Sequence, residues 1–184
     1  MSYRVWGWGT AADEPTEQGL RDLAPFVSAV TGLDVQEPER PGALQELPPV
    51  RRALPGSLAR LGSTDPEDRA RHGIGRAYRD VVTAMRGQVR DVPDVVVRPE
   101  SEQDVVDVLD WAASAGVAVV PFGGGSSVVG GVEPRGLERA VSLDLSLLNG
   151  LLEVDSTSRA VRLQAGTLGP AAEAINRPNT LPAT

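Results

Sequence analysis

The chain has 184 residues, which is enough for one domain of ordinary size together with an extension. Its net charge of −7 argues against general affinity for nucleic acid or for an anionic membrane surface. The lack of cysteine and the single histidine exclude disulfides, thiolate catalysis and a metal site built from several such ligands. Because the sequence contains no run of about eighteen apolar residues and no signal-peptide pattern, we expect a cytoplasmic protein without a transmembrane segment.

Two tryptophans stand near the N-terminus. Trp6 and Trp8 lie two residues apart, so an extended segment would turn both indoles toward one face. Aromatic residues at a terminus usually pack that terminus onto the body of the protein. We therefore predict that both tryptophans clamp the N-terminal segment onto the rest of the chain.

The segment that follows is predicted to be helical and then rich in proline. A capping threonine and regularly spaced apolar residues predict a helix over residues 16–31, which Gly32 ends. Six prolines from Pro38 to Pro66 prevent long stretches of regular structure. We therefore assign residues 1–62 to an N-terminal extension and connector, and residues 63–184 to the domain itself.

A second helical pattern begins next to a proline. Apolar residues at helical spacing predict a long helix over residues 66–90, either continuous or broken, which Gly73, Gly75 and Gly87 weaken locally. His72 lies in this stretch, and we interpret it as a structural residue in preference to a catalytic one. Residues 51–98 hold ten arginines and six acidic residues. This excess is either a solvated helix face, which we favour, or a surface that faces an anionic substrate.

The next stretch predicts a strand, a helix and a second strand. Residues 95–97 suit a buried strand, and Ser101 with Asp104 forms a capping-box pattern at the start of a helix. Gly116 ends this helix directly before the next apolar run, so we expect a parallel, right-handed βαβ unit. The apolar face of the helix is predicted to comprise Val105, Val106, Leu109, Ala112 and Ala113.

A run of three glycines follows the second strand. Residues 117–120 suit a short buried strand, and we expect Pro121 to stop it because proline has no amide N–H to donate. The residues Gly123–Gly125 permit positive φ and a close approach of a ligand to the backbone, and Ser126 and Ser127 add hydroxyl groups. Successive amides in such a turn can surround a phosphate or diphosphate. A bare glycine run can equally be a tight turn with no ligand.

Neither of two common nucleotide motifs fits this loop. A Walker-type phosphate loop needs a lysine, and the whole chain has none. The G-x-G-x-x-G pattern fails because Val128 occupies its last glycine position. The loop leaves the carboxyl end of a parallel strand, which is where open α/β sheets bind ligands. We therefore expect a diphosphate bound by a loop and not by a helix N-terminus.

The remaining segments are predicted to be a strand, a hairpin and a short helix. Residues 140–145 suit a strand, and residues 151–154 and 160–164 flank a polar turn as in a β-hairpin. A helix is predicted over residues 168–175, capped by the segment that ends at Thr167. The last nine residues contain two prolines and no apolar pattern, which is not typical of the end of a domain.

The sequence RPESEQDVVDVLDWAASAGVAVVPFGGGSSVVGG, which begins at Arg98, resembles the FAD-binding domains of FAD-linked oxidases of the vanillyl-alcohol-oxidase type. In that family, a strand, a helix and a strand present backbone amides to the FAD diphosphate through a proline- and glycine-containing motif. The resemblance implies FAD as the cofactor, and it assigns the cofactor-binding positions to Pro121, Phe122, Gly123, Gly124, Gly125, Ser126 and Ser127.

A narrower resemblance is to alkyldihydroxyacetone-phosphate synthases, which exchange an acyl group for a fatty alcohol on a phosphorylated triose. It rests on the WGWG start, the proline-rich connector and the residues Glu67, Asp68, Arg69, His72, Gly73 and Asp80. The likeness ends near residue 175. We therefore expect an incomplete domain with catalytic residues beyond residue 184. We expect this chain alone to bind FAD weakly or not at all, to show no turnover and to oligomerise.

The resemblance implies an α+β fold: a PCMH-type FAD-binding domain with a βαβ unit, antiparallel strands and a helical N-terminal extension. It implies a flavin-dependent oxidoreductase or alkyl transferase that acts on a small substrate of phosphorylated or lipid-like character, and it leaves a homodimer open for the full-length protein. Two alternatives remain. One is a flavin-dependent dehydrogenase of 2-hydroxy acids such as D-lactate or glycolate, and the other is a non-catalytic nucleotide-binding fragment.

Overall fold

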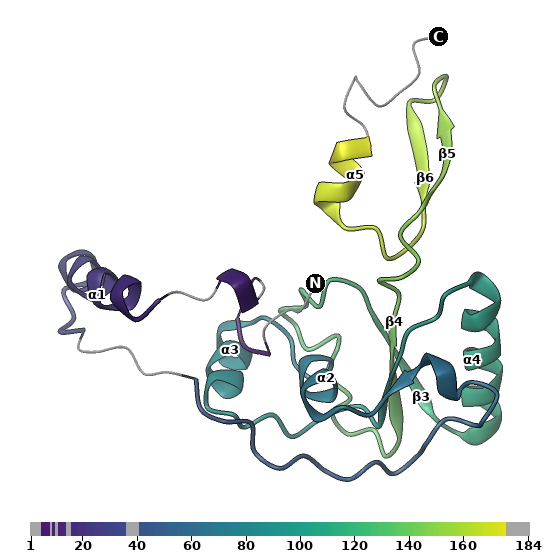
Figure 1. The fold of residues 1–184 in the computed structure, drawn as a ribbon, viewed down its shortest axis with the longest axis horizontal. Coiled ribbons are helices and arrows are strands. Elements are labelled where there is room, and N and C mark those ends of the chain that lie inside the picture. Colours follow the sequence, from purple (N-terminus) through teal and green to yellow (C-terminus); the bar gives the residue numbers. More distant parts are fainter. Residues whose placement is uncertain (1–4, 8, 10, 14–15, 36–40, 176–184) are drawn as a thin grey trace.

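The computed structural model describes residues 5–7, 9, 11–13, 16–35 and 41–175 (Figure 1). Its helical elements are η1 (Ala11–Asp13), α1 (Glu17–Thr31), η2 (Ala59–Leu61), α2 (Pro66–Arg71), α3 (Tyr78–Met85), α4 (Glu102–Ala115) and α5 (Gly169–Ile175). Its strands are β1 (Gly62–Ser63), β2 (Val95–Val97), β3 (Ala118–Phe122), β4 (Ala140–Asp144), β5 (Leu151–Asp155) and β6 (Ala160–Leu163). Together these elements confirm the predicted α+β class.

The central sheet has the strand order β1-β2-β4-β3. Strands β2, β4 and β3 are parallel, and β1 pairs antiparallel to β2. The predicted βαβ unit is therefore present, but β4 lies between its two strands. Helix α4 covers one face of the sheet, and α2 and α3 lie on the other side (Figure 1). The core on the α4 side includes Val95, Val97, Val108, Ala112, Val141 and Leu143.

Helix α4 begins and ends where the sequence predicts, but it presents a different face to the sheet. The Ser101 hydroxyl accepts from the Asp104 amide at 3.1 Å, the Asp104 carboxylate accepts from the Ser101 amide at 3.0 Å, and Gly116 ends the helix at φ +63°. Val108 is fully buried, whereas Val106 and Leu109 are exposed. The prediction is right for Val105 and Ala112 and wrong for Val106, Leu109 and Ala113. The residues that pack against the core are Val105, Val108, Ala112 and Ala115.

Strand β3 runs through Pro121 to Phe122, so the prediction that proline stops the strand is wrong. The Phe122 carbonyl accepts from the Leu145 amide, and the Ala118 amide donates to the Arg139 carbonyl. Backbone groups alternate in direction along a strand, so Pro121 points its nitrogen away from β4. A proline is tolerated at this edge position because no ladder hydrogen bond is lost.

Instead of one helix over residues 66–90, the chain forms the two short helices α2 and α3. The segment between them passes so close to other backbone that only glycine fits. A Cβ at Gly73 would lie 2.4 Å from the Asp91 carbonyl oxygen, and one at Gly75 would lie 2.5 Å from the Ser127 carbonyl oxygen. These tertiary contacts override the helical spacing of the apolar residues.

The N-terminal tryptophan prediction is only partly tested. Trp6 packs against the second cluster of buried residues, which comprises Ala70, Ile74, Ala84, Val89 and Val92. The backbone is bent at Gly7, with φ +68°, and is not extended as predicted. Trp8 lies outside the described residues. Helix α1 has the predicted Thr16 and Gly32 caps, but none of its residues is buried.

Residues 41–58 form neither helix nor strand, as the prolines predict. The assignment of residues 1–62 and 63–184 to separate parts remains a prediction.

The hairpin of β5 and β6 and the short helix α5 lie beyond the carboxyl end of β4 (Figure 1). The Thr167 hydroxyl, predicted near the cap of α5, makes no hydrogen bond to any described residue. Among the described residues, no helix has the length and apolar character needed to cross a bilayer.

Candidate functional site

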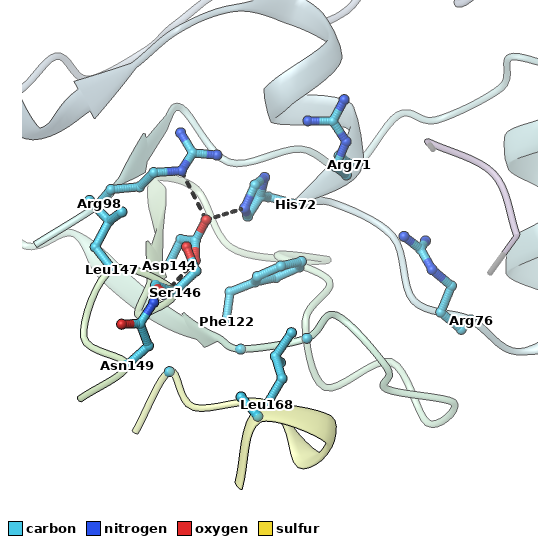
Figure 2. Close-up of a pocket in the computed structure, with 14 residues that line it drawn as sticks. Arg71, His72, Arg76, Arg98, Phe122, Asp144, Ser146, Leu147, Asn149 and Leu168 are labelled. Atoms are coloured by element: carbon cyan, nitrogen blue, oxygen red, sulfur yellow. Dashed lines mark hydrogen bonds and ion pairs between the residues drawn. The ribbon is translucent and has the colours of Figure 1, made fainter. Parts of the chain in front are cut away.

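A cavity of about 630 Å³ lies at the carboxyl ends of the three parallel strands (Figure 2). Arg98 follows β2, the glycine loop follows β3, and Asp144 ends β4. The carboxyl ends of parallel strands meet at one edge of a sheet, so these residues come together although they are far apart in sequence. The cavity is lined by Arg71, His72, Arg76, Arg98, Phe122, Gly123, Gly124, Asp144, Ser146, Leu147, Asn149, Gly166, Leu168 and Ala171.

The three glycines of the loop have two distinct roles. A Cβ at Gly123 would meet no atom within 4 Å, and one at Gly124 would meet only Leu168 Cδ2 at 3.5 Å. Gly125 has φ +65°, and its Cβ would lie 2.5 Å from the Phe122 ring. Gly123 and Gly124 therefore keep open space on the cavity side, and Gly125 allows the backbone to turn over Phe122.

The fold leaves the amide groups of residues 123–127 unbonded within the described part of the chain, and of these five residues Gly125 alone is buried. None of these five N–H groups donates a hydrogen bond to a group in the described part of the chain. The loop is held instead through other atoms of Ser127. Its carbonyl oxygen accepts from the Arg76 amide at 2.7 Å, and its hydroxyl accepts from the Gly131 amide at 2.8 Å. A loop with free amides and fixed ends suits an anionic ligand.

Of the predicted site residues, the structure brings Phe122, Gly123 and Gly124 to the cavity wall. Pro121 is an edge-strand residue, and Gly125 is a buried residue within the loop. Ser126 is exposed, and Ser127 fixes the end of the loop. The assignment of these residues to cofactor binding remains a prediction.

Three arginines contribute positive charge to the cavity wall. The Arg98 guanidinium binds both oxygens of Asp68, at 2.8 and 2.6 Å, and also donates to Asp144 at 3.0 Å. The buried Nε of Arg71 makes no hydrogen bond within the described residues. Arg76 is buried, and that burial lowers the pKa of its guanidinium. Part of the arginine excess therefore faces a cavity, contrary to the interpretation as a solvated helix face.

Asp144 is a buried carboxylate that accepts several hydrogen bonds. Burial alone would raise its pKa, but hydrogen bonds from His72 and Ser146 outweigh this effect and lower the pKa to about 2. His72 Nε2 lies 3.2 Å from Asp144 Oδ2, and the Ser146 amide donates to Oδ1 at 2.9 Å. Figure 2 shows Asp144 between His72 and Arg98. At neutral pH the site thus carries an ionised carboxylate beside a group of cations.

The neighbouring carboxylate, Asp68, completes this network. Burial raises its pKa, but the two hydrogen bonds from Arg98 contribute to a net lowering. The same bonds raise the pKa of Arg98. The Arg98 guanidinium is therefore neutralised by two carboxylates, and Arg71 and Arg76 are the other two arginines at the cavity wall.

Comparison with known proteins identifies the domain. Residues 93–181 match a family model described as an FAD binding domain. These 89 of the 184 residues are therefore similar to that family. The match includes β2, α4, β3, the glycine loop, β4 and the hairpin, and it confirms the predicted FAD-linked family and its cofactor, FAD.

The relatives of this FAD-binding domain are larger proteins. The chain is 34% identical over 141 residues to an alkyldihydroxyacetonephosphate synthase of Trypanosoma brucei brucei, with 70% of this chain and 22% of that protein covered. It is 37% identical over 106 residues to the synthase of Dictyostelium discoideum, covering 57% of this chain and 17% of that protein. A solved structure of an alkyldihydroxyacetonephosphate synthase has a TM-score of 0.76 and 26% identity, with 93% of this chain and 37% of that chain covered.

The chain thus spans about a fifth of the length of these two curated relatives. The similarity in sequence and structure confirms the predicted resemblance to the synthases.

Several residues of the cavity in this FAD-binding domain were not among the predicted site residues. Arg98 directly follows β2, and Asp144 is the last residue of β4. The expectation that ligands bind at the carboxyl ends of parallel strands therefore applies to these two residues as it does to the glycine loop. Arg71, His72 and Arg76 come from α2 and the segment after it, and no local pattern connects them to the loop. His72 was interpreted as structural. It is hydrogen-bonded as that interpretation requires, but it also lines the cavity.

Proposed function

We propose that the cavity binds the diphosphate of FAD and that residues 123–127 donate their amides to its oxygens. The observation that carries the proposal is the loop itself, in which free amides lie beside open space at Gly123 and Gly124. Each amide bond to a charged oxygen contributes about 1.5–3 kcal/mol. A few such bonds would retain a diphosphate without any lysine.

The residues around the loop fit this ligand. Arg71, with its buried and unbonded Nε, and Arg76 supply positive charge near a dianionic group. Leu147, Leu168 and Phe122 supply apolar surface for the organic parts of the cofactor. When bound, FAD would supply the redox chemistry of its flavin ring, and the chain would supply position and electrostatics.

We propose further that this chain is the FAD-binding part of a flavin-dependent enzyme of the alkyldihydroxyacetonephosphate synthase kind. The named relatives and the structural similarity support this activity in preference to a hydroxy-acid dehydrogenase. The substrate would then be phosphorylated and lipid-like. A homodimer and a cytoplasmic location remain predictions from the sequence.

The test is an amide NMR titration of the 184-residue chain with FAD, ADP and AMP. NMR is chosen because it detects weak binding, and we expect this chain alone to bind FAD weakly or not at all. FAD and ADP should move the signals of residues 123–127, and AMP should move them less because it lacks the second phosphate.

Two glycine variants make the titration specific. Gly123→Ala places a methyl group in open space, so the free protein should fold normally while ADP binding weakens at least about tenfold. Gly56→Ala is the matched control, because its Cβ would also meet nothing within 4 Å and Gly56 is not in the cavity wall. Unchanged ADP affinity in Gly123→Ala, or ligand-induced shifts confined to another surface, would exclude the loop as the diphosphate site.

A further inference from the structure

The glycine loop rests on a chain of side-chain contacts that begins at Asp144. The Phe122 ring lies beneath Gly125, and its centroid is 4.1 Å from that of the His72 ring. His72 in turn contacts Asp144 through Nε2 at 3.2 Å. Figure 2 shows His72 between the carboxylate and the phenyl ring. A displacement of the imidazole would therefore reach the loop through Phe122.

The orientation of His72 is fixed on both sides of the ring. Its Nδ1 lies 2.7 Å from the Asp68 carbonyl oxygen, one turn back in α2, and its Nε2 faces the Asp144 carboxylate. The Arg98 guanidinium donates to the side-chain carboxylates of both Asp68 and Asp144. The Asp144 carboxylate also accepts from the Ser146 amide. With only 2% of its surface exposed, His72 is enclosed within this network.

The other end of the loop is held by the same segment. The Arg76 amide donates to the Ser127 carbonyl oxygen at 2.7 Å, and Gly75 packs directly against that oxygen. Residues 72–76 thus support the loop at its start through Phe122 and at its end through Ser127. The free amides between these two points therefore depend on a segment that is some fifty residues distant in sequence.

We infer that His72 and Asp144 are positioning residues, which act through Phe122 to hold the amides of residues 123–125 in the conformation that accepts a diphosphate. This inference rests on the proposed function. An apolar core could support a strand end without buried charges, and buried charged groups are expensive unless fully paired. The network instead places rigid polar groups directly behind the loop, and such groups specify one orientation more strongly than apolar packing does.

The experiment compares His72→Ala and Phe122→Leu with Asp94→Asn. Asp94 is a matched control because it is also a buried carboxylate that accepts from an arginine, Arg51, but it does not line the cavity. Three quantities are measured for each variant: the free energy of unfolding in urea, the ligand-free amide shifts of residues 123–125, and the affinity for ADP.

The expected result is that His72→Ala and Phe122→Leu move the loop amide shifts and weaken ADP binding about tenfold, the loss of roughly one amide–phosphate hydrogen bond. Asp94→Asn should destabilise the protein while it leaves ADP affinity within about twofold. Should His72→Ala fail to fold, Asp144→Asn takes its place, because it alters the carboxylate that His72 contacts and leaves Phe122 unchanged.

The inference is overturned if the two variants leave the loop shifts in place, or if they alter ADP affinity no more than Asp94→Asn does. A failure of the proposed function would give a different set of results. In that case the unsubstituted chain binds neither FAD nor ADP, while the ligand-free amide shifts still report whether His72 and Phe122 position the loop.

Discussion

Replacement of Asp144 by asparagine should remove a stabilisation that depends on pH. The pKa of Asp144 is lowered from 3.8 to about 2 in the folded protein. Each pKa unit corresponds to about 1.4 kcal/mol, so the ionised carboxylate stabilises the folded state by about 2 kcal/mol. Because the folded pKa is the lower one, this stabilisation is fully present above about pH 4 and is lost as the pH falls toward about 2.

The assay is urea unfolding of the unsubstituted protein and Asp144→Asn, followed by tryptophan fluorescence, from about pH 6 down to about pH 3. The difference in the free energy of unfolding should be largest near neutral pH and should fall by about 1 kcal/mol at about pH 3. Asp110→Asn, at an exposed position of α4, is the control and should show little difference at any pH. A difference for Asp144→Asn that stays constant over this pH range would refute the reasoning.

Three further predictions concern stability and use the same unfolding assay. Gly125→Ala should destabilise the fold by about 1–3 kcal/mol, because φ is +65° there and the methyl group meets the Phe122 ring; no change in stability would contradict this. Trp6→Ala should lower stability by about 2 kcal/mol through lost contact with the buried cluster, and native fluorescence should lose its blue-shifted component; an unchanged spectrum would show that Trp6 is not packed. Ser101→Ala should cost about 1 kcal/mol because the Asp104 amide loses its cap, and Ser114→Ala, near the end of the same helix, is the comparison that should cost less.

Local signals in the sequence predicted the elements that they encode directly. The capping pair Ser101 and Asp104 and the terminal Gly116 define the limits of α4 because each acts on its own turn of helix. The polar turn between residues 155 and 160 likewise defines the hairpin. The glycine loop was also predicted, because its backbone freedom is a property of the residues themselves.

Features that depend on tertiary contacts were not predicted from the sequence. The break between α2 and α3 is set by close approach of Gly73 and Gly75 to backbone far along the chain. The buried face of α4 is different, because Val105, Val108, Ala112 and Ala115 stand at helical spacing and the sequence therefore carried this signal, although the predicted face omitted Val108. His72 reaches Asp144 across a separation of 72 residues, so its place in the cavity could not be predicted without the strand order.

The position of Pro121 has a consequence for how the molecules behave at high concentration. An uncovered edge strand offers a row of backbone donors and acceptors to a strand of another molecule. At the end of β3 nearest the cavity, the outward-facing nitrogen belongs to Pro121 and carries no hydrogen. The opposite edge, β1, has only two residues. The edges of the four-stranded sheet therefore offer few backbone groups for pairing with a strand of another molecule. Intermolecular β-assembly should begin instead at the β5–β6 hairpin, because every residue of β5 is exposed.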